Sequence, residues 1–249
     1  MTGHHRSTKI PDSLAFYASE PHQCNYLPDK QALTVFADPN AIMNTSIYSR
    51  IIDYGFRRSG EYVYIPRCPG CDACISVRIP VNEFKPDRSQ RRIIRKNSDL
   101  TILRHPPVFN EKHYQLYRTY IQSRHHGGGM DNPTPKDYVK FLTSSWSNTV
   151  FYEFNLSGRL LAVSVVDHLH NGMSAVYTHF DPAEEKRSLG SYAILWLIKE
   201  TRLLGLNWLY LGYYIANCQK MLYKSRYRPL EAFINGHWHK FHKDEPITL

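Results

Sequence analysis

Three cysteines, Cys68, Cys71 and Cys74, recur at every third position of this 249-residue chain. Their spacing can present soft sulfur ligands to one metal, and Cys24, or His22 instead, could supply a fourth ligand from a distant segment. Tetrahedral zinc requires four such ligands, and iron–sulfur clusters accept the same set. Free thiols that serve packing are the equal alternative, so the cysteines predict either a structural zinc or iron–sulfur site or none.

A strongly basic run occupies residues 85–96, which hold six Lys or Arg residues against one aspartate. If this run is helical from about Arg88, then Arg88, Arg91, Arg92 and Arg95 share one face at helical spacing. Like charges side by side cost stability, and a phosphate backbone that neutralised them would recover that cost and release counterions. A solvated surface helix is the alternative. We predict that the stripe contacts nucleic acid.

A short turn, Arg187-Ser188-Leu-Gly190, lies between an expected strand and an expected helix. Backbone amides at such a turn, together with the positive end of the helix dipole, can bind phosphate. An ordinary turn that needs one glycine is the alternative. The arrangement resembles the Gcn5-related N-acetyltransferase superfamily, whose equivalent turn binds the pyrophosphate of acetyl-coenzyme A.

Aromatic and basic residues alternate through residues 210–229, and Lys220 and Tyr223 lie at the centre of this segment. Such a mixture suits stacking on unpaired bases together with phosphate contact, as at the single-stranded 3′ end of tRNA. Several of these tyrosines could instead be residues at the edge of the core. We predict that Lys220 and Tyr223 contact an unpaired end of a nucleic acid such as tRNA.

The composition favours a polyanionic partner, because 31 Lys and Arg exceed 22 Asp and Glu. The first twenty residues lack the apolar core of a secretory signal, and no stretch is apolar enough to span a membrane. An odd number of cysteines, five, argues against a disulfide framework. We therefore expect a cytoplasmic protein with no membrane association.

The elements that must position these groups predict an α+β fold. A small cysteine-containing α+β domain is expected at 1–106, followed at 107–249 by an α/β domain like that of the Gcn5-related N-acetyltransferases, with a mixed central sheet. Consecutive prolines at 106 and 107 mark the boundary, because they continue neither a helix nor a central strand. Helices are expected at 44–55, from 88, and at 111–123, 138–142 and 187–205; strands are expected at 62–66, 75–81, 150–154, 160–166, 175–180 and 206–213.

Together these residues resemble a known family, the arginyl-tRNA–protein transferases, and within it the short bacterial branch of aspartate/glutamate leucyltransferases. The Ser-Gln-Arg-Arg run at 89–92 and the Leu-Gly-Tyr to Tyr-Arg-Pro run at 211–229 are the most specific matches. Other matching stretches are 24–28, 55–60, 68–81, 97–100, 174–177, 180–182 and 187–193. Eukaryotic members carry a Cys-x-x-Cys pair and an adjacent Cys-Cys pair. This chain departs from that pattern, so the resemblance does not carry metal binding over to it.

The resemblance implies an aminoacyl-tRNA donor and a protein acceptor that begins with Asp or Glu and is marked for degradation. Leucyl-tRNA is the expected donor and arginyl-tRNA the alternative. The reaction is aminolysis of an activated ester and needs no nucleotide or redox cofactor. We expect Asp181 to orient the amine, and Tyr177 or Tyr213 to donate to the oxyanion or the leaving ribose oxygen. A turn-forming Asp-Pro and ordinary strand tyrosines are the alternatives.

An acidic N-terminal side chain needs a cationic partner, and a guanidinium suits a carboxylate best. The candidates are Arg78, Lys224 and Arg228, with Arg187 as a further one. Two other functions remain open from the residues alone. One is an acetyl-coenzyme A-dependent N-acetyltransferase, and the other is a non-enzymatic, metal-dependent tRNA-binding protein.

Overall fold

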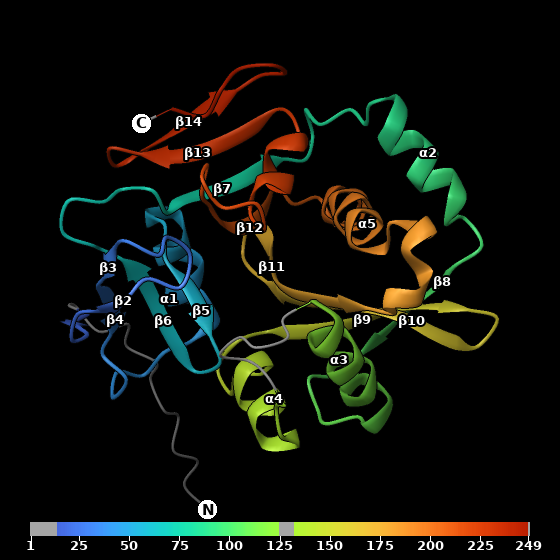
Figure 1. Ribbon diagram of the computed structural model, residues 1–249, viewed down its shortest axis with the longest axis horizontal. Coiled ribbons are helices and arrows are strands. Elements are labelled where there is room, and N and C mark those ends of the chain that lie inside the picture. The colour runs from blue at the N-terminus through green and yellow to red at the C-terminus, as the bar shows by residue number, and fades with distance from the viewer. Residues whose placement is uncertain (1–13, 125–131, 249) are drawn as a thin grey trace, which may run out of the picture.

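The computed structural model describes residues 14–124 and 132–248. In these residues a large mixed sheet of eight strands has the order β14-β13-β7-β12-β11-β10-β9-β8, and a small sheet has the order β1-β4-β6-β5. Figure 1 shows α5 and α2 on one side of the large sheet and α3 and α4 on the other. The α+β class with a mixed central sheet is therefore confirmed. The run His-His-Gly-Gly-Gly at 125–129, where the sequence predicts that a flexible loop breaks the chain, lies outside the described residues.

The N-terminal elements build the small sheet and the helix beside it. They are β1 (Phe16–Ala18), β2 (His22–Gln23), β3 (Gln31–Ala32), β4 (Thr34–Ala37), α1 (Thr45–Ile51), η1 (Ile52–Tyr54), β5 (Arg57–Ser59) and β6 (Tyr62–Pro66). Helix α1 begins as predicted, because the Asn44 side chain accepts a hydrogen bond from the Ile47 amide at 2.9 Å. It ends through η1 at Gly55, whose φ of 89° is readily adopted only by glycine.

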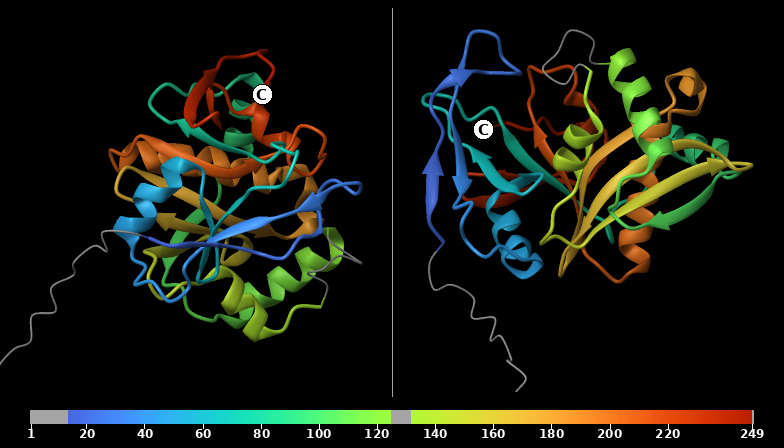
Figure 2. Two further views of the ribbon diagram at one scale, coloured as in Figure 1. Left: turned by 90° about the vertical axis from the view of Figure 1, so that its left-hand side faces the viewer. Right: turned by 90° about the horizontal axis from the view of Figure 1, so that it is seen from below.

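The remaining elements build the large sheet and its covering helices. They are β7 (Ile75–Pro80), α2 (Arg88–Lys96), β8 (Thr101–His105), α3 (Glu111–Arg124), α4 (Pro135–Leu142), β9 (Thr149–Leu156), β10 (Arg159–His168), β11 (Gly172–Phe180), η2 (Pro182–Arg187), α5 (Leu189–Leu203), β12 (Trp208–Tyr214), η3 (Leu222–Arg226), β13 (Leu230–Ile234) and β14 (His237–Phe241). Both β7 and β8 come from before residue 106 and lie in the same sheet as β9 to β14. Figure 2 shows the small sheet beside the large one. Among the described helices, none has the length and apolarity needed to cross a bilayer.

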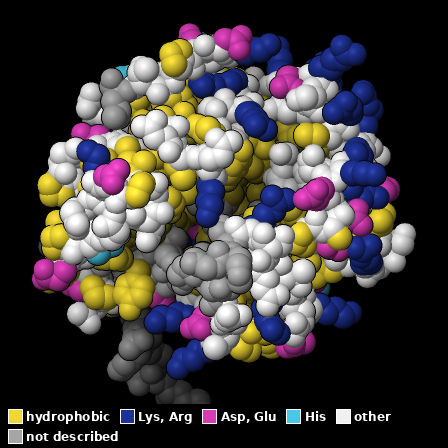
Figure 3. Space-filling view, in the orientation of Figure 1, with side chains coloured by type: hydrophobic (Ala, Val, Ile, Leu, Met, Phe, Trp, Pro, Cys, Tyr) yellow, Lys and Arg dark blue, Asp and Glu magenta, His cyan; other side chains and the backbone are white. Residues whose placement is uncertain are grey.

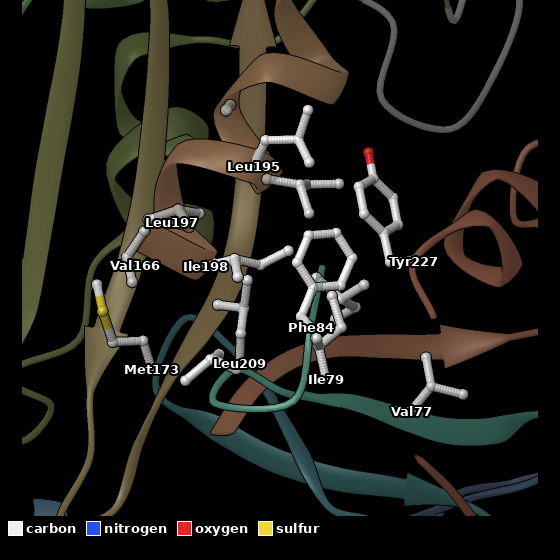
Figure 4. Packing of buried hydrophobic residues seen from close by; sticks show 14 of the residues in the cluster. Val77, Ile79, Phe84, Val166, Met173, Leu195, Leu197, Ile198, Leu209 and Tyr227 are labelled. Atoms are coloured by element: carbon white, nitrogen blue, oxygen red, sulfur yellow. The ribbon is translucent and has the colours of Figure 1, made fainter. Parts of the chain in front are cut away.

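The main core lies between α5 and the large sheet. Figure 4 shows Leu195 and Ile198 of α5 packed toward Leu209 of β12 and Ile79 of β7. Each of these side chains is almost fully buried. Burial of one such side chain contributes about 1.5–3 kcal/mol, so this layer fixes α5 against the middle of the sheet.

The large sheet divides between its two parallel strands, β11 and β12. They pair only where Gly172–Ser174 meets Trp208–Tyr210, after which β11 continues beside β10 and β12 beside β7. A Cβ atom on Gly172 would lie 2.5 Å from the Trp208 carbonyl oxygen, so the contact requires glycine. Beyond Tyr210 the facing edges of the two strands are not paired with each other. Figure 3 shows that this face of the molecule is hollowed near its centre.

Candidate functional site

The predicted basic helix forms at α2, and one end of it borders a groove. Asp87 caps the helix: its side chain accepts from the Gln90 amide at 2.8 Å, and the Gln90 side chain accepts from the Asp87 amide at 2.9 Å. The groove encloses about 620 Å³ and lies between α2 and the start of α5. Its lining residues are Arg92, Ile93, Arg95, Lys96, Lys186 and Ser188. In Figure 3, Lys and Arg side chains gather over α2.

The charges of this basic groove are available to a ligand. Arg92, Arg95, Lys96 and Lys186 form no ion pair with any residue that the structure describes. Ser188 precedes α5 in a left-handed conformation, and its side chain makes no capping hydrogen bond. The first amides of α5 and the positive end of its dipole therefore add to the four cations. Such a groove favours a polyanion.

The other residues of the predicted phosphate turn have partners inside the protein. Arg187 makes two hydrogen bonds of 2.9 Å to the carboxylate of Asp99 and lies 3.4 Å from Glu184. These contacts join the turn to the segment after α2 and neutralise the guanidinium. A Cβ atom on Gly190 would lie 3.0 Å from the ring of Phe180, so this glycine allows α5 to pack closely. Of the three predicted turn residues, Ser188 alone lines the groove.

The remaining predicted tRNA contacts are exposed but lie outside the groove lining. Arg88 and Arg91 stand on α2, and Arg91 donates from Nη1 to the Pro86 carbonyl at 2.6 Å. Lys220 and Tyr223 come after β12, and 40% of Tyr223 is exposed. All four are accessible to a large ligand.

Two of the three predicted catalytic side chains are engaged in the fold. The Asp181 carboxylate accepts from the Ala183 amide at 3.0 Å, as the cap of η2, and from Arg159 at 2.5 Å. The Tyr213 hydroxyl is buried and donates toward two main-chain carbonyls, those of Gly55 at 3.0 Å and Tyr64 at 3.2 Å. Both side chains therefore already have partners inside the protein, and their predicted catalytic roles stay predictions.

The Tyr177 hydroxyl differs from these two. It is buried and has no hydrogen-bond partner among the described residues. Its ring packs against Tyr117 and Phe141, with centroids 5.8 and 5.3 Å apart. Burial raises the pKa of Tyr177, and the nearby Tyr120, Tyr117 and Tyr223 hydroxyls raise it further. Tyr177 is therefore a protonated donor with an unused hydrogen bond.

Arg78, a predicted acid-binding residue, is already paired. Its Nη1 lies 2.8 Å from Asp53 and its Nε lies 2.9 Å from Glu231. The guanidinium also stacks between the rings of Trp208 and Trp238, at 3.8 and 4.0 Å from their centroids. Its charge is neutralised by the protein's own carboxylates.

Arg228 is held by main-chain oxygens. Its Nε donates to the Ser225 carbonyl at 2.8 Å and its Nη2 to the Glu245 carbonyl at 2.9 Å, while Nη1 is buried without a partner among the described residues. Burial lowers the pKa of Arg228 below its usual value.

Lys224 has a different environment, because it is a buried cation and no carboxylate in residues 14–124 or 132–248 forms an ion pair with it. Only 5% of the residue is exposed, and its Nζ donates to the main-chain carbonyl of Tyr213. Burial lowers the pKa of Lys224 to about 7, and the nearby Arg57 guanidinium lowers it as well, against a smaller opposing effect of the Cys218 and Cys74 thiols. Sequence reasoning gave Arg57 no role, although it lies in a stretch that matches the family.

The predicted cysteine ligands lie near one another without forming a metal site. Within the described residues, no three His, Cys, Asp or Glu side chains are placed to hold a metal ion. Burial raises the pKa of Cys74 to about 12, and the Cys68, Cys24 and Cys71 thiols raise it further. Cys68 instead accepts from the Leu33 amide at 3.4 Å. As placed, the thiols do not fit a zinc ion or a cluster.

Comparisons with known proteins cover most of the chain. The family model described as "Arginine-tRNA-protein transferase, N terminus" matches residues 22–92, and its C-terminal counterpart matches residues 112–234. Aspartate/glutamate leucyltransferases of Pseudomonas aeruginosa and Pseudomonas fluorescens are 53% and 51% identical over 225 residues, which are 90% of this chain and 96% of each relative. The structure of L-PGS from Bacillus licheniformis covers 68% of this chain and 50% of its own, with a TM-score of 0.46 and 11% identity, too low to bear on function.

Proposed function

This chain belongs to the arginine-tRNA-protein transferase family, and from that membership we propose that it transfers leucine from leucyl-tRNA to proteins beginning with Asp or Glu. The observation that carries the proposal is 53% identity to a leucyltransferase over nearly the whole of both chains. The protein is thus an aminoacyltransferase, acting in the cytoplasm on acceptors that the added residue marks for degradation. Arginyl transfer by the same chemistry is the alternative.

The basic groove supports binding of the tRNA donor. Its four unpaired cations lie beside the start of α5, where main-chain amides add further donors for phosphate. We assign the groove to the phosphates of the acceptor arm, and the exposed Lys220 and Tyr223 to its unpaired 3′ end. Phosphate contacts hold the arm in register without reading its sequence.

The enzyme mainly has to position the ester of leucyl-tRNA and the α-amine of the acceptor. The acceptor's α-amine attacks the ester carbonyl carbon of leucyl-tRNA, a C–N bond forms, and the C–O bond to the ribose breaks. The amine proton leaves, and the ribose oxygen gains one. An α-amino group has a pKa of about 7.7–8.0, so a fair fraction is neutral near pH 7 and a strong base is not required. The unused Tyr177 hydroxyl is our candidate donor to the developing oxyanion.

The test is transfer of radiolabelled amino acid from leucyl-tRNA or arginyl-tRNA to peptides that differ only at residue one. We expect leucine on peptides that begin with Asp or Glu, little on their Asn and Gln counterparts, and no product when acetyl-coenzyme A replaces charged tRNA. Tyr177→Phe should lower kcat by about 100-fold if Tyr177 supplies an oxyanion donor. Failure to transfer either amino acid to acidic peptides would refute the proposal.

A further inference from the structure

Four cationic side chains of the described residues are buried: Arg57, Arg58, Arg78 and Lys224. Arg58 and Arg78 each meet at least one carboxylate within 2.9 Å. Arg57 and Lys224, each only 5% exposed, form no ion pair with any described residue. Within the described residues, two of the four buried cations have a counter-charge and the other two have none.

The two uncompensated cations share one neighbour. Lys224 donates from Nζ to the main-chain carbonyl of Tyr213, and the Arg57 guanidinium lies 5.9 Å from the centroid of the Tyr213 ring. The guanidinium also lies 5.4 Å from the centroid of the Tyr210 ring. Its hydrogen bonds go to main-chain carbonyls, and its Nε is buried without a partner among the described residues. A buried charge without a partner costs several kcal/mol, and the lowered pKa of Lys224 is the expression of that cost. An anion from outside the chain would offset that cost.

This cation pair lies at the division of the large sheet. Tyr213 comes three residues after Tyr210, the last residue of β12 that pairs with β11. Gly212 comes directly before Tyr213 and has a φ of 79°. A Cβ atom on Gly212 would lie 3.8 Å from Lys224 Nζ. The glycine therefore leaves the lysine amine without a side chain over it from β12. A ligand bound here would lie in the split between the two halves of the sheet.

Resting on the proposed function, we propose that Lys224 and Arg57 bind the side-chain carboxylate of the acceptor's N-terminal Asp or Glu. A carboxylate on one or two methylene groups can enter a closed site, whereas the phosphates of a tRNA backbone suit the open basic groove. Arg78 is satisfied by Asp53 and Glu231, so it has no charge left for a substrate. The assignment keeps one predicted acid-binding residue, Lys224, and adds Arg57.

The test compares Asp- and Asn-initiated peptides, which have nearly the same shape and differ in charge. We expect Lys224→Met to reduce the Asp-to-Asn ratio of kcat/KM on the order of 100-fold, because a buried charge pair is lost. The affinity of the variant for leucyl-tRNA should stay at the wild-type value. The thermal midpoint of the free protein should not fall, since the variant removes an uncompensated buried charge.

Arg226→Met is the matched control, because Arg226 is exposed and lies two residues further along η3. It removes the same charge and should leave the ratio unchanged. An unchanged Asp-to-Asn ratio in Lys224→Met would overturn the inference. Weaker binding of leucyl-tRNA with no change in that ratio would also overturn it, because the bound anion would then be a phosphate. A lower midpoint or a variant that does not fold would make Lys224 a structural residue and would also overturn it.

The inference and the proposed function fail in different measurements. If the wild-type protein transfers no amino acid to acidic peptides, the proposed function fails before any variant is made. Calorimetric titration with the same two peptides, without tRNA, then gives the Asp-to-Asn ratio of affinities for wild-type protein and Lys224→Met. Equal ratios in the two proteins would refute the cation pair as the acid-binding site.

Discussion

The basic groove makes a quantitative prediction about tRNA binding. Two of its four cations, Arg92 and Arg95, lie on α2, and neither forms an ion pair with a described residue. Replacing both with alanine removes two phosphate contacts while keeping good helix formers in α2. If the groove holds the acceptor arm, the double variant should bind leucyl-tRNA more weakly and with a smaller dependence on salt.

The magnitude follows from counterion release. Log K falls as log salt rises, and each phosphate contact adds about 0.9 to the steepness of this fall for a duplex. Two lost contacts therefore make the fall shallower by about 1.8. At 0.1 M salt each contact is worth about eightfold in affinity on this scale, and the pair about sixtyfold. At 1 M salt the difference between wild-type and variant protein should largely disappear.

Fluorescence anisotropy of labelled leucyl-tRNA, titrated at several salt concentrations, measures both quantities. The matched control is the double alanine variant of Arg88 and Arg91, which lie on the same helix but outside the groove lining. Both double variants change the net charge equally. If they weaken binding to the same extent, the basic face acts as a general attraction, and the assignment of the groove to the acceptor arm is refuted.

Two further predictions concern buried charge. Asp167→Asn leaves the Arg58 guanidinium, paired with Asp167 at 2.5 Å and fully buried, without its counter-charge, and should lower the free energy of unfolding by about 3–5 kcal/mol in urea titrations; a loss under about 1 kcal/mol would contradict this. Burial lowers the pKa of His179 to about 3, so below pH 6.5 the unfolded chain binds a proton that the folded chain does not. The free energy of unfolding therefore decreases as the pH is lowered. His179→Phe should remove this loss, about 2 kcal/mol between pH 7.5 and 5, in urea titrations at both values; an unchanged pH dependence would reject the assignment.

Most of the helices and central strands could be predicted because their local signals agree. Helix α2 begins at Arg88, as its charge periodicity indicates, and α1 has both its Asn44 cap and its Gly55 stop. Strands β1 to β5, β8, β13 and β14 were not predicted. β8 has a weak pattern of burial with no fully buried residue, and it is held by pairing with β9, which is remote in sequence. Such strands depend on partners that local periodicity does not reveal.

The sequence could predict site residues only where the role of a residue follows from its type and not from a partner that is remote in the chain. The arginines of α2 are charged whatever their partners, and all four are exposed, so they are accessible to a ligand. The role of Arg187 depends on Asp99, which lies 88 residues away in the chain. No spacing rule indicates that contact, so a predicted phosphate ligand became the partner of a carboxylate.

The two consecutive arginines of β5 show why partners decide function. Neighbouring side chains of a strand point to opposite faces, so Arg57 and Arg58 meet different surroundings although both are 5% exposed. Arg58 finds Asp167 on β10, whereas Arg57 lies near Lys224 and meets only main-chain oxygens and aromatic rings. The sequence Arg-Arg therefore contains one structural cation and one cation whose counter-charge is absent from the described residues.

The two cationic sites of this chain differ in hydration, and that difference fits the two substrates. An exposed cation gains at most about 1 kcal/mol from one more carboxylate, too little to separate Asp from the isosteric Asn by more than a few fold. The exposed basic groove can therefore hold a polyanion through many weak contacts, but it cannot read one charge. A buried cation pair can read one charge, because an amide in place of the carboxylate leaves both cations uncompensated. Selection of acidic over amide N-termini thus requires cations that the fold itself does not neutralise, and Arg57 and Lys224 meet that requirement where Arg78 does not.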